Sequence, residues 1–263
     1  MTADTPSSDA AARPLAAIIL AAGKGTRMQS DLPKVAHEVA GRPMITWVVD
    51  AVRRAGASRI VVVVGHAADV VKGCLAGDDD DVEYVLQAEQ LGTGHAVMVC
   101  EPAFEGFEGD VLVLAGDGPL IRPSTIGTML ERHRTDGAAA TLATSTVEDP
   151  TGYGRVVRDA DGGFGAIVEQ KNATPEQLAI REIYPSYACF DAAAMFDRLR
   201  RLEKDPVGGE YYVTELPAML KEAGRVVSVV DAVPPEDVLS INTPEQLAEV
   251  DAIMRRRLAE VGE

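Results

Sequence analysis

The segment 20–28 (LAAGKGTRM) places glycines and positive charge directly after an apolar run. Gly23 and Gly25 let the backbone approach a phosphate closely and leave its N–H groups free to bind the anion. Four charged side chains lie within eleven positions and carry a local excess of positive charge: Lys24, Arg27, Asp31 and Lys34. In a chain with a net charge of −16, this cluster indicates a site for an oligophosphate.

Two common phosphate-binding motifs do not describe this loop. The Walker motif needs a glycine where Ile18 stands, and the dinucleotide motif needs one where Met28 stands. For the loop taken alone, a simple turn without a ligand is the alternative interpretation.

Gln87 opens a second polar segment, 87–96 (QAEQLGTGHA), at the end of an apolar stretch. A side-chain amide presents a donor and an acceptor side by side, which matches the O4/N3–H edge of uracil or thymine. Gly92 and Thr93 then form a close backbone turn into an expected helix, which suits hydrogen bonds with a base or a sugar. The alternative is a polar loop in which Thr93 caps that helix.

Asp117 and Asn242 have the side chains expected of a magnesium site. Asp117 lies between two glycines after an apolar strand, and Asn242 also follows a short apolar stretch. Mg²⁺ prefers one or two protein oxygens and leaves its other positions to water and phosphate. Asn242 could instead only precede the cap of the last helix, because Thr243-Pro244-Glu245 is a good helix start.

Three further segments could hold a sugar acceptor. The turn 149–155 is rich in glycine, Glu169 ends an apolar strand, and the segment 209–215 carries two tyrosines. A carboxylate such as Glu169 can accept hydrogen bonds from two sugar hydroxyls. A surface ion pair between Glu169 and Lys171 is the alternative.

Strand-like runs that alternate with helix-like segments position these residues. The expected strands are 15–20, 59–65, 82–86 and 110–114, and the helices between them are 43–56, 67–75 and 94–100. This order predicts a Rossmann-like α/β fold with a parallel sheet, right-handed crossovers and helices on both faces. Ligands bind at the carboxyl ends of such strands, so the glycine loop, Gln87 and Asp117 should converge on one edge.

The second half of the chain predicts a mixed, partly antiparallel extension of the sheet on the acceptor side of the cleft. Its expected strands are shorter and separated by turns: 138–147, 154–158 and 163–168. The remaining expected elements are helices at 192–202 and 213–223, a strand at 225–230 and a final helix at 244–261.

The composition is that of a globular chain of 263 residues. We expect a disordered segment at 1–14, one domain over 15–243 and a C-terminal helix over 244–263. A net charge of −16 repels a phosphate backbone and argues against nucleic-acid binding. We expect neither a signal peptide nor a membrane-spanning segment, because the sequence shows no apolar stretch of the required kind, and its three scattered cysteines fit a reducing compartment. These features predict a cytoplasmic protein.

Together, these segments resemble the sugar-1-phosphate nucleotidyltransferase family, and most closely its uridyltransferase domains that act on N-acetylglucosamine 1-phosphate. The resemblance extends from about residue 16 to residue 242, and these segments carry it: 20–28, 32–35, 87–95, 116–117, 149–155, 167–169 and 209–214. It implies the Rossmann-like mixed sheet of nucleotide-diphospho-sugar transferases. It also implies Mg²⁺-dependent transfer of UMP from UTP to N-acetylglucosamine 1-phosphate, a step of nucleotide-sugar biosynthesis.

The resemblance further implies roles for individual residues. Arg27 and Lys34 look like the pair that grips the triphosphate, and with Asp117 they are the expected catalytic residues. The expected nucleotide contacts are Leu20, Ala21, Ala22, Gly23, Lys34, Gln87, Gly92 and Thr93. The expected sugar contacts are Gly154, Glu169, Tyr184 and Asn242. Asp117 and Asn242 look like the Mg²⁺ ligands.

The sequence departs from the family pattern at the acceptor side. The family motif Glu-Ile-Asn-Thr-Gly appears here as residues 182–186 (EIYPS), so Tyr184 replaces a sugar-binding asparagine, and Ala115 stands where a tyrosine is usual. Another sugar 1-phosphate, dTTP as the donor, or a nucleotide-sugar-binding protein without activity are therefore the alternatives. The acetyltransferase β-helix of bifunctional members is missing from this sequence, so we expect a monomer or weak dimer.

Overall fold

The computed structural model describes residues 13–23, 25–28, 30–78 and 80–262. The segment 1–14, which is predicted to be disordered, lies outside this description except for Arg13 and Pro14. Lys24 of the glycine loop also lies outside the described residues.

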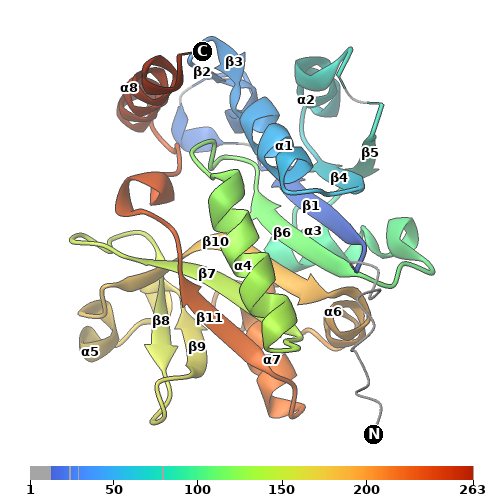
Figure 1. The fold of residues 1–263 in the computed structure, drawn as a ribbon, viewed down its shortest axis with the longest axis vertical. Coiled ribbons are helices and arrows are strands. Elements are labelled where there is room, and N and C mark those ends of the chain that lie inside the picture. The colour runs from blue at the N-terminus through green and yellow to red at the C-terminus, as the bar shows by residue number, and fades with distance from the viewer. Residues whose placement is uncertain (1–12, 24, 29, 79, 263) are drawn as a thin grey trace, which may run out of the picture.

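One β-sheet runs through the molecule and positions the candidate site (Figure 1). Within the described residues it has nine strands in the order β11-β7-β10-β6-β1-β4-β5, with β8 and β9 added beside β10. β1 (Leu15–Ala21) lies between β6 (Asp110–Ala115) and β4 (Arg59–Val64), and β5 (Val82–Leu86) follows β4 at the edge. These four strands are parallel, as predicted.

β10 (Glu182–Asp191) is a strand that the sequence analysis does not predict. It lies antiparallel between β6 and β7 (Ala140–Thr146). Its register with β7 shifts between Ile183 and Tyr187, and Ser186 has a positive φ of 68° at this irregularity. The alternating pattern that would mark a strand is therefore broken in the middle of the element.

Three further strands form the mixed extension. β8 (Gly154–Arg158) pairs antiparallel with β10 and with β9 (Phe164–Val168), and β11 (Val227–Asp231) lies parallel to β7. The predicted partly antiparallel extension is confirmed, and it forms one sheet with the parallel strands.

Helices cover both faces of the sheet, as predicted, and α1 and α4 cross in front of it in Figure 1. Apolar side chains of α1 (Met44–Arg54), α2 (Ala68–Leu75) and α4 (Pro123–Thr135) form one buried cluster with one face of the strands. The opposite face is covered by α3 (Thr93–Met98), α6 (Ala192–Leu199) and α7 (Leu216–Glu222).

Strand β1 shows why a continuous apolar run is needed between two helical layers. Ala16 and Ile18 belong to the cluster with α3 and α6, whereas Ala17 and Ile19 belong to the cluster with α1 and α4. Successive side chains of a strand point to opposite faces, and both faces are buried here.

Helix α4 is missing from the sequence-based prediction. Its buried residues Ile126, Met129, Leu130 and His133 do recur at helical spacing. Gly127, on the exposed side of the helix, lowers the helix propensity of the segment.

The C-terminal helix α8 (Pro244–Val261) has the predicted bounds. It packs beside the small sheet of β2 (Glu38–Val39) and β3 (Arg42–Pro43), as Figure 1 shows. The remaining short elements are η1 (Thr26–Met28), η2 (Lys34–Ala36), η3 (Glu101–Phe104), η4 (Gln170–Asn172), α5 (Pro175–Leu178), η5 (Val213–Glu215) and η6 (Pro235–Val238).

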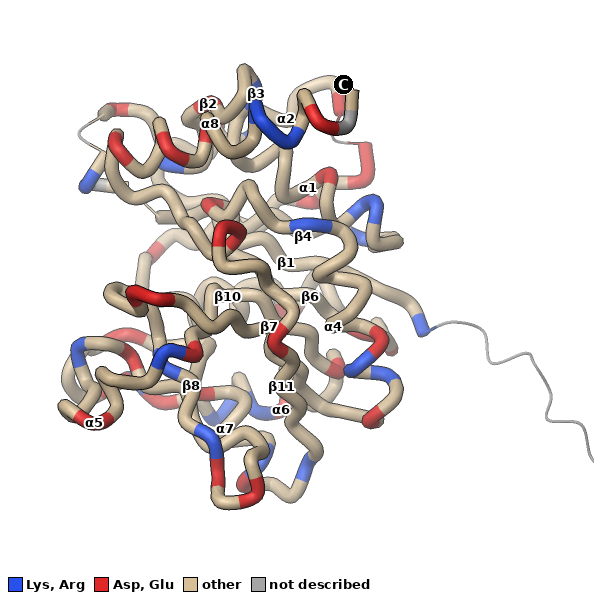
Figure 2. The backbone as a smooth tube through the Cα atoms, turned by 60° about the vertical axis from the view of Figure 1, so that its left-hand side comes forward, with Lys and Arg blue, Asp and Glu red and all other residues tan. Residues whose placement is uncertain are grey.

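Acidic residues are distributed along the folded chain and are not confined to one element (Figure 2). Arg13 meets two of them at the start of β6 and the end of β10, because it forms ion pairs with Asp110 at 3.1 Å and with Asp191 at 2.6 Å. Among the described residues, none of the helices combines the length and the apolar character needed to cross a membrane.

Candidate active site

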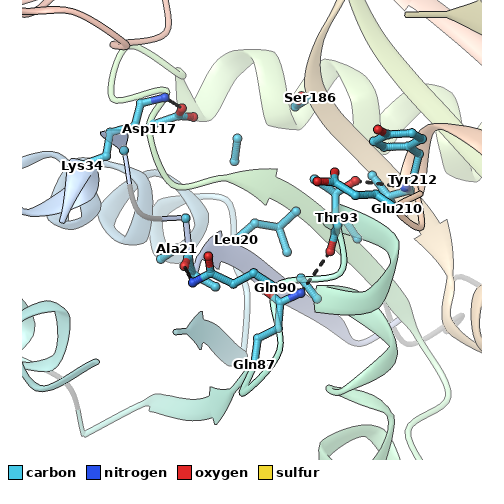
Figure 3. Close-up of a pocket in the computed structure, with 18 of the residues that line it drawn as sticks. Leu20, Ala21, Lys34, Gln87, Gln90, Thr93, Asp117, Ser186, Glu210 and Tyr212 are labelled. Carbon is cyan, nitrogen blue, oxygen red and sulfur yellow. Dashed lines mark hydrogen bonds and ion pairs between the residues drawn. The ribbon is translucent and has the colours of Figure 1, made fainter. Parts of the chain in front are cut away.

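A cavity of about 550 Å³ lies where β1, β5 and β6 end. Its walls come from the glycine loop, the segment after β5, the end of β6, Glu169 after β9, the first half of β10, the segment 210–214 and Asn242. Figure 3 shows Lys34 and Asp117 at one end of the cavity and Glu210 and Tyr212 at the other. The convergence of strand ends on one site is therefore confirmed.

Most of the residues predicted for the site line this cavity. They are Leu20, Ala21, Ala22, Gly23, Arg27, Lys34, Gln87, Gly92, Thr93, Asp117, Glu169, Tyr184 and Asn242. Gly154 is buried on β8 behind the wall, where it pairs with Tyr184. A Cβ atom at Gly154 would lie 3.9 Å from Glu169 Oε1, so this glycine is a neighbour of the carboxylate.

The glycine loop folds back on the helical turn that carries Lys34. Gly25 has a φ of 61°, and a Cβ atom there would lie 2.7 Å from the Cβ atom of Lys34. Both the positive φ and this close approach require glycine. The loop is also fixed from the second polar segment, because Gln90 Nε2 donates to the Ala22 carbonyl at 2.7 Å.

Four polar side chains meet at the cationic end of the cavity. Lys34 Nζ donates to Asn242 Oδ1 at 2.7 Å and contacts the carboxylate of Asp117, and Arg27 Nη2 donates to the same Asn242 oxygen at 2.7 Å. The side chains of Lys34 and Asp117 are mostly buried, with exposed fractions of 15% and 22%. One carboxylate oxygen and one amide oxygen thus converge on a single cation, which is the donor set that Mg²⁺ prefers.

The backbone holds the two oxygen donors together. Ile241 N donates to the carbonyl of Asp117 at 3.4 Å, and Gly116 N donates to the carbonyl of Leu20 at 2.9 Å. Asn242 N donates to Gln246 Oε1 in the first turn of α8, where Thr243 is the N-cap. The cap-neighbour role considered for Asn242 is therefore present, and its side chain faces the cavity as well.

Gln87 is almost fully buried, with 4% of its surface exposed. Its Nε2 donates to the Gly92 carbonyl at 3.0 Å and lies 3.2 Å from His95 Nδ1. From the sequence, the amide is expected to offer both a donor and an acceptor to a base. Here the amide nitrogen is directed into the protein, because the tight turn at Gly92 brings a carbonyl within its reach.

The turn at Gly92 is tied to the segment after residue 209. Gly92 has a φ of 103°, and a Cβ atom there would lie 2.4 Å from the Tyr211 carbonyl oxygen. Gly94 N donates to that oxygen at 2.7 Å, and Val213 N donates to Thr93 Oγ1 at 3.1 Å. The segment 209–215 therefore forms part of the wall and also holds the turn at Gly92 in place.

Another part of the cavity wall contains a carboxylate, Glu169, beside a buried phenol, Tyr184. Thr214 Oγ1 donates to Glu169 Oε1 at 3.3 Å, whereas Lys171 Nζ donates to the Tyr212 hydroxyl at 2.6 Å. The ion pair between Glu169 and Lys171 considered above is therefore not formed. Burial raises the pKa of the Tyr184 hydroxyl, and the charge of Glu169 raises it further, so this phenol stays protonated.

Some lining residues are absent from the predicted site. Ser186 lies at the irregularity of β10, and Gln90 points toward the glycine loop. Gln90 could be found by its place in the second polar segment. Ser186 could be found by its place in the motif segment 182–186, which also contains Tyr184.

An α/β sheet with a phosphate-type loop after β1 and a polar cavity at the strand ends defines a nucleotide-binding enzyme fold of Rossmann-like type. Residues 17–226 match the family described as MobA-like NTP transferase domain. The chain belongs to this family and is a nucleotidyltransferase, which confirms the resemblance stated above.

Curated relatives extend the comparison over nearly the whole chain. "Bifunctional protein GlmU" of Geobacter metallireducens is 48% identical over 244 residues, which cover 93% of this chain and 51% of the relative. The proteins of the same name from Pelotomaculum thermopropionicum and Clostridium botulinum are 48% and 43% identical, and the matches cover 94% and 92% of this chain. They cover 53% and 52% of those relatives, so the chain spans about half of their length.

Proposed function

We propose that this nucleotidyltransferase transfers UMP from UTP to N-acetylglucosamine 1-phosphate, which gives UDP-N-acetylglucosamine and pyrophosphate. The observation that supports this most directly is the convergence of Lys34, Asp117 and Asn242 at one end of the cavity whose other end carries Glu169 and Tyr184. One end suits an oligophosphate with a cation, and the other suits hydroxyl groups. The similarity to proteins named Bifunctional protein GlmU is consistent with this assignment.

The reaction needs positioning and charge neutralisation more than proton transfer. A phosphate oxygen of the sugar 1-phosphate attacks the α-phosphorus of UTP, and the bond from that phosphorus to the oxygen bridging it to the β-phosphorus breaks. The nucleophile is already an anion, so no general base is required. Arg27 and Lys34 would hold the triphosphate and offset its charge. Holding two anions in line lowers the barrier by up to about 7–11 kcal/mol.

Asp117 and Asn242 would hold Mg²⁺, because their side-chain oxygens already converge on one cation. When bound, Mg²⁺ neutralises phosphate charge and polarises the phosphoryl group under attack. In this arrangement Lys34 would turn from the two oxygens toward the triphosphate.

Glu169 and Tyr184 would orient the sugar. The carboxylate of Glu169 accepts hydrogen bonds from hydroxyl groups, and Tyr184 remains a neutral donor because its pKa is raised. Tyr184 stands where the family motif has asparagine, so the preferred sugar is the property that most needs a direct measurement.

A pyrophosphate-release screen tests this proposal. UTP, dTTP, CTP and ATP are each combined with N-acetylglucosamine 1-phosphate, glucose 1-phosphate and galactose 1-phosphate, with Mg²⁺ or with EDTA. The proposal predicts the highest rate for UTP with N-acetylglucosamine 1-phosphate and none with EDTA. An Asp117→Ala variant that unfolds like the wild type is the matched control and is expected to be inactive. Tight binding of a nucleotide sugar without pyrophosphate release from any pair would overturn the proposal.

A further inference from the structure

Helix α8 begins at the cationic end of the candidate site and ends beside another part of it. Asn242 N donates to Gln246 Oε1 at 2.7 Å, which fixes Asn242 to the first turn of the helix. Near the other end of α8, Arg257 Nη1 donates to the Leu120 carbonyl at 3.1 Å. Leu120 lies three residues after Asp117 in the same loop. The helix therefore touches the segments that carry both oxygen donors.

The contact of Arg257 with Leu120 rests on an ion cluster around the buried Asp237. Asp237 is completely buried, and its carboxylate contacts Arg257 and also accepts from Arg122 Nε at 2.5 Å and Nη2 at 3.1 Å. Arg257 Nη2 donates to Glu236 Oε1 at 2.8 Å as well. A buried carboxylate needs its cationic partners, because an unpaired buried charge is strongly unfavourable. The cluster thus fixes the guanidinium of Arg257 beside the Asp117 loop.

Apolar packing connects α8 to the glycine loop as well. Val250, Ile253 and Met254 of α8 form one buried cluster with Leu120 and with Met28, the residue after Arg27. Ile241, which precedes Asn242 and donates to the Asp117 carbonyl, belongs to the same cluster. The glycine loop, the Asp117 loop and Asn242 therefore share one support.

We propose that α8 contributes to the binding site of the nucleoside triphosphate and that Arg257 is a positioning residue on this helix. Arg257 holds Asp117 at the right distance from Asn242 for a metal–triphosphate complex. This inference rests on the proposed function, because it assigns those two residues to the metal. Arg257 does not touch the cavity, so it acts through the Leu120 carbonyl. Residues that orient metal ligands from outside typically change metal affinity on the order of tenfold or more.

The chain offers a matched control on the next position of the same helix. Arg256 also forms an ion pair with Glu236, at 2.9 Å, but its side chain is 55% exposed, whereas that of Arg257 is 17% exposed. Arg256→Met removes a guanidinium and an ion pair from α8. It leaves the contacts to Asp237 and to the Leu120 carbonyl in place.

Calorimetric binding to the full chain tests the inference. The ligands are UTP with Mg²⁺ and, separately, uridine, which has no phosphate and does not report on the metal. Arg257→Met is expected to weaken binding of UTP with Mg²⁺ about tenfold. It should leave uridine binding unchanged, and Arg256→Met should change neither. All titrations are run at a temperature at which circular dichroism shows each variant to be folded.

Arg257→Lys separates the bridge to Leu120 from the charge alone. A lysine can pair with Asp237 but lacks the planar fork that reaches two acceptors at once, so it is expected to bind UTP with Mg²⁺ as poorly as Arg257→Met. The inference is overturned if Arg257→Lys binds like the wild type. It is also overturned if Arg257→Met matches Arg256→Met or loses uridine and UTP equally. If the wild type itself does not bind UTP with Mg²⁺, the proposed function fails first.

Discussion

Lys34 Nζ lies 2.7 Å from Asn242 Oδ1, and the same nitrogen contacts the carboxylate of Asp117. The ammonium group therefore occupies the space between the two oxygens that we assign to Mg²⁺. In the protein without nucleotide, we expect Lys34 and a divalent cation to compete for these two oxygens. A triphosphate removes this competition, because it offers Lys34 other oxygens.

The variant Lys34→Gln tests this competition. Without nucleotide, it is expected to bind Mn²⁺ more tightly than the wild type by on the order of tenfold, since a unit charge about 4 Å from the metal is removed. Its binding of UTP with Mg²⁺ should become weaker, because a triphosphate contact is lost. Electron paramagnetic resonance of Mn²⁺ measures the first effect and calorimetry the second. Lys72→Gln, on the exposed side of α2, is the control, and unchanged Mn²⁺ affinity in Lys34→Gln would contradict the account.

Tyr184 provides the test of the acceptor end. Tyr184→Phe keeps the ring and removes the hydroxyl group that remains protonated because its pKa is raised. Loss of one hydrogen bond to the sugar should lower kcat/KM for the sugar 1-phosphate about tenfold, with the KM for UTP unchanged. The control is Tyr153→Phe, because the hydroxyl of Tyr153 donates to the Val238 carbonyl at 3.0 Å outside the cavity. Equal effects of the two variants would show that Tyr184 does not contact the acceptor.

A substitution at Gly92 is expected to weaken nucleotide binding more than it destabilises the fold. A Cβ atom at residue 92 would lie 2.4 Å from the Tyr211 carbonyl oxygen, so Gly92→Ala must displace either the turn or the segment after 209. We expect UTP binding to weaken by more than tenfold, with about 1–2 kcal/mol lost from the free energy of unfolding.

Gly106→Ala is the comparison for Gly92→Ala, because Gly106 also has a positive φ, of 71°, but nothing lies within 4 Å of its Cβ position. It measures the cost of an alanine at a positive φ without a close contact, about 1 kcal/mol. Calorimetry with UTP and urea unfolding of both variants are the measurements. The same UTP affinity in both variants would mean that the turn at Gly92 does not shape the nucleotide site.

The sequence predicts the elements whose apolar pattern is uninterrupted. β1 and β4 are continuous apolar runs because both of their faces are buried, and each is located within one residue of its end. β10 is missed because Pro185 and the positive φ of Ser186 break the pattern where the strand changes its pairing. The break arises because β10 pairs with three strands, β6, β7 and β8. The residues of β10 alone do not indicate these pairings.

The site is predictable where its residues follow strand ends. Asp117 and Asn242 could be paired as oxygen donors from their places after apolar runs, and the structure brings them onto one cation. The orientation of the Gln87 amide could not be predicted, because it depends on the carbonyl that the turn at Gly92 presents. The contribution of α8 also could not, because it depends on the distant contact of Arg257 with Leu120.

The buried side chain of His133 is expected to make the stability of the fold depend on pH. Burial lowers the pKa of His133 below its ordinary value, and the Asp110 carboxylate offsets this only in part. Above the unfolded pKa of about 6.5, the ring is neutral in both states. Below it, the unfolded chain takes up a proton that the folded chain does not, so stability falls as the pH falls.

Urea unfolding at pH 7 and at pH 5.5 measures this effect. The free energy of unfolding of the wild type should fall by up to about 1.4 kcal/mol per pH unit from this group. His133→Asn, in which an amide nitrogen can replace Nδ1 beside Thr141, should show a smaller fall over the same interval. Equal pH dependence of the two proteins would mean that His133 does not carry the effect.

The most direct test of the central claim follows the oxygen atoms of the acceptor. N-acetylglucosamine 1-phosphate labelled with ¹⁸O at all non-bridging phosphate oxygens is incubated with UTP, Mg²⁺ and the protein, and the products are analysed by mass spectrometry. Attack by the sugar phosphate on the α-phosphorus predicts that all of the label remains in UDP-N-acetylglucosamine and that the pyrophosphate carries none. Labelled pyrophosphate, or release of pyrophosphate without a labelled nucleotide sugar, would contradict the account.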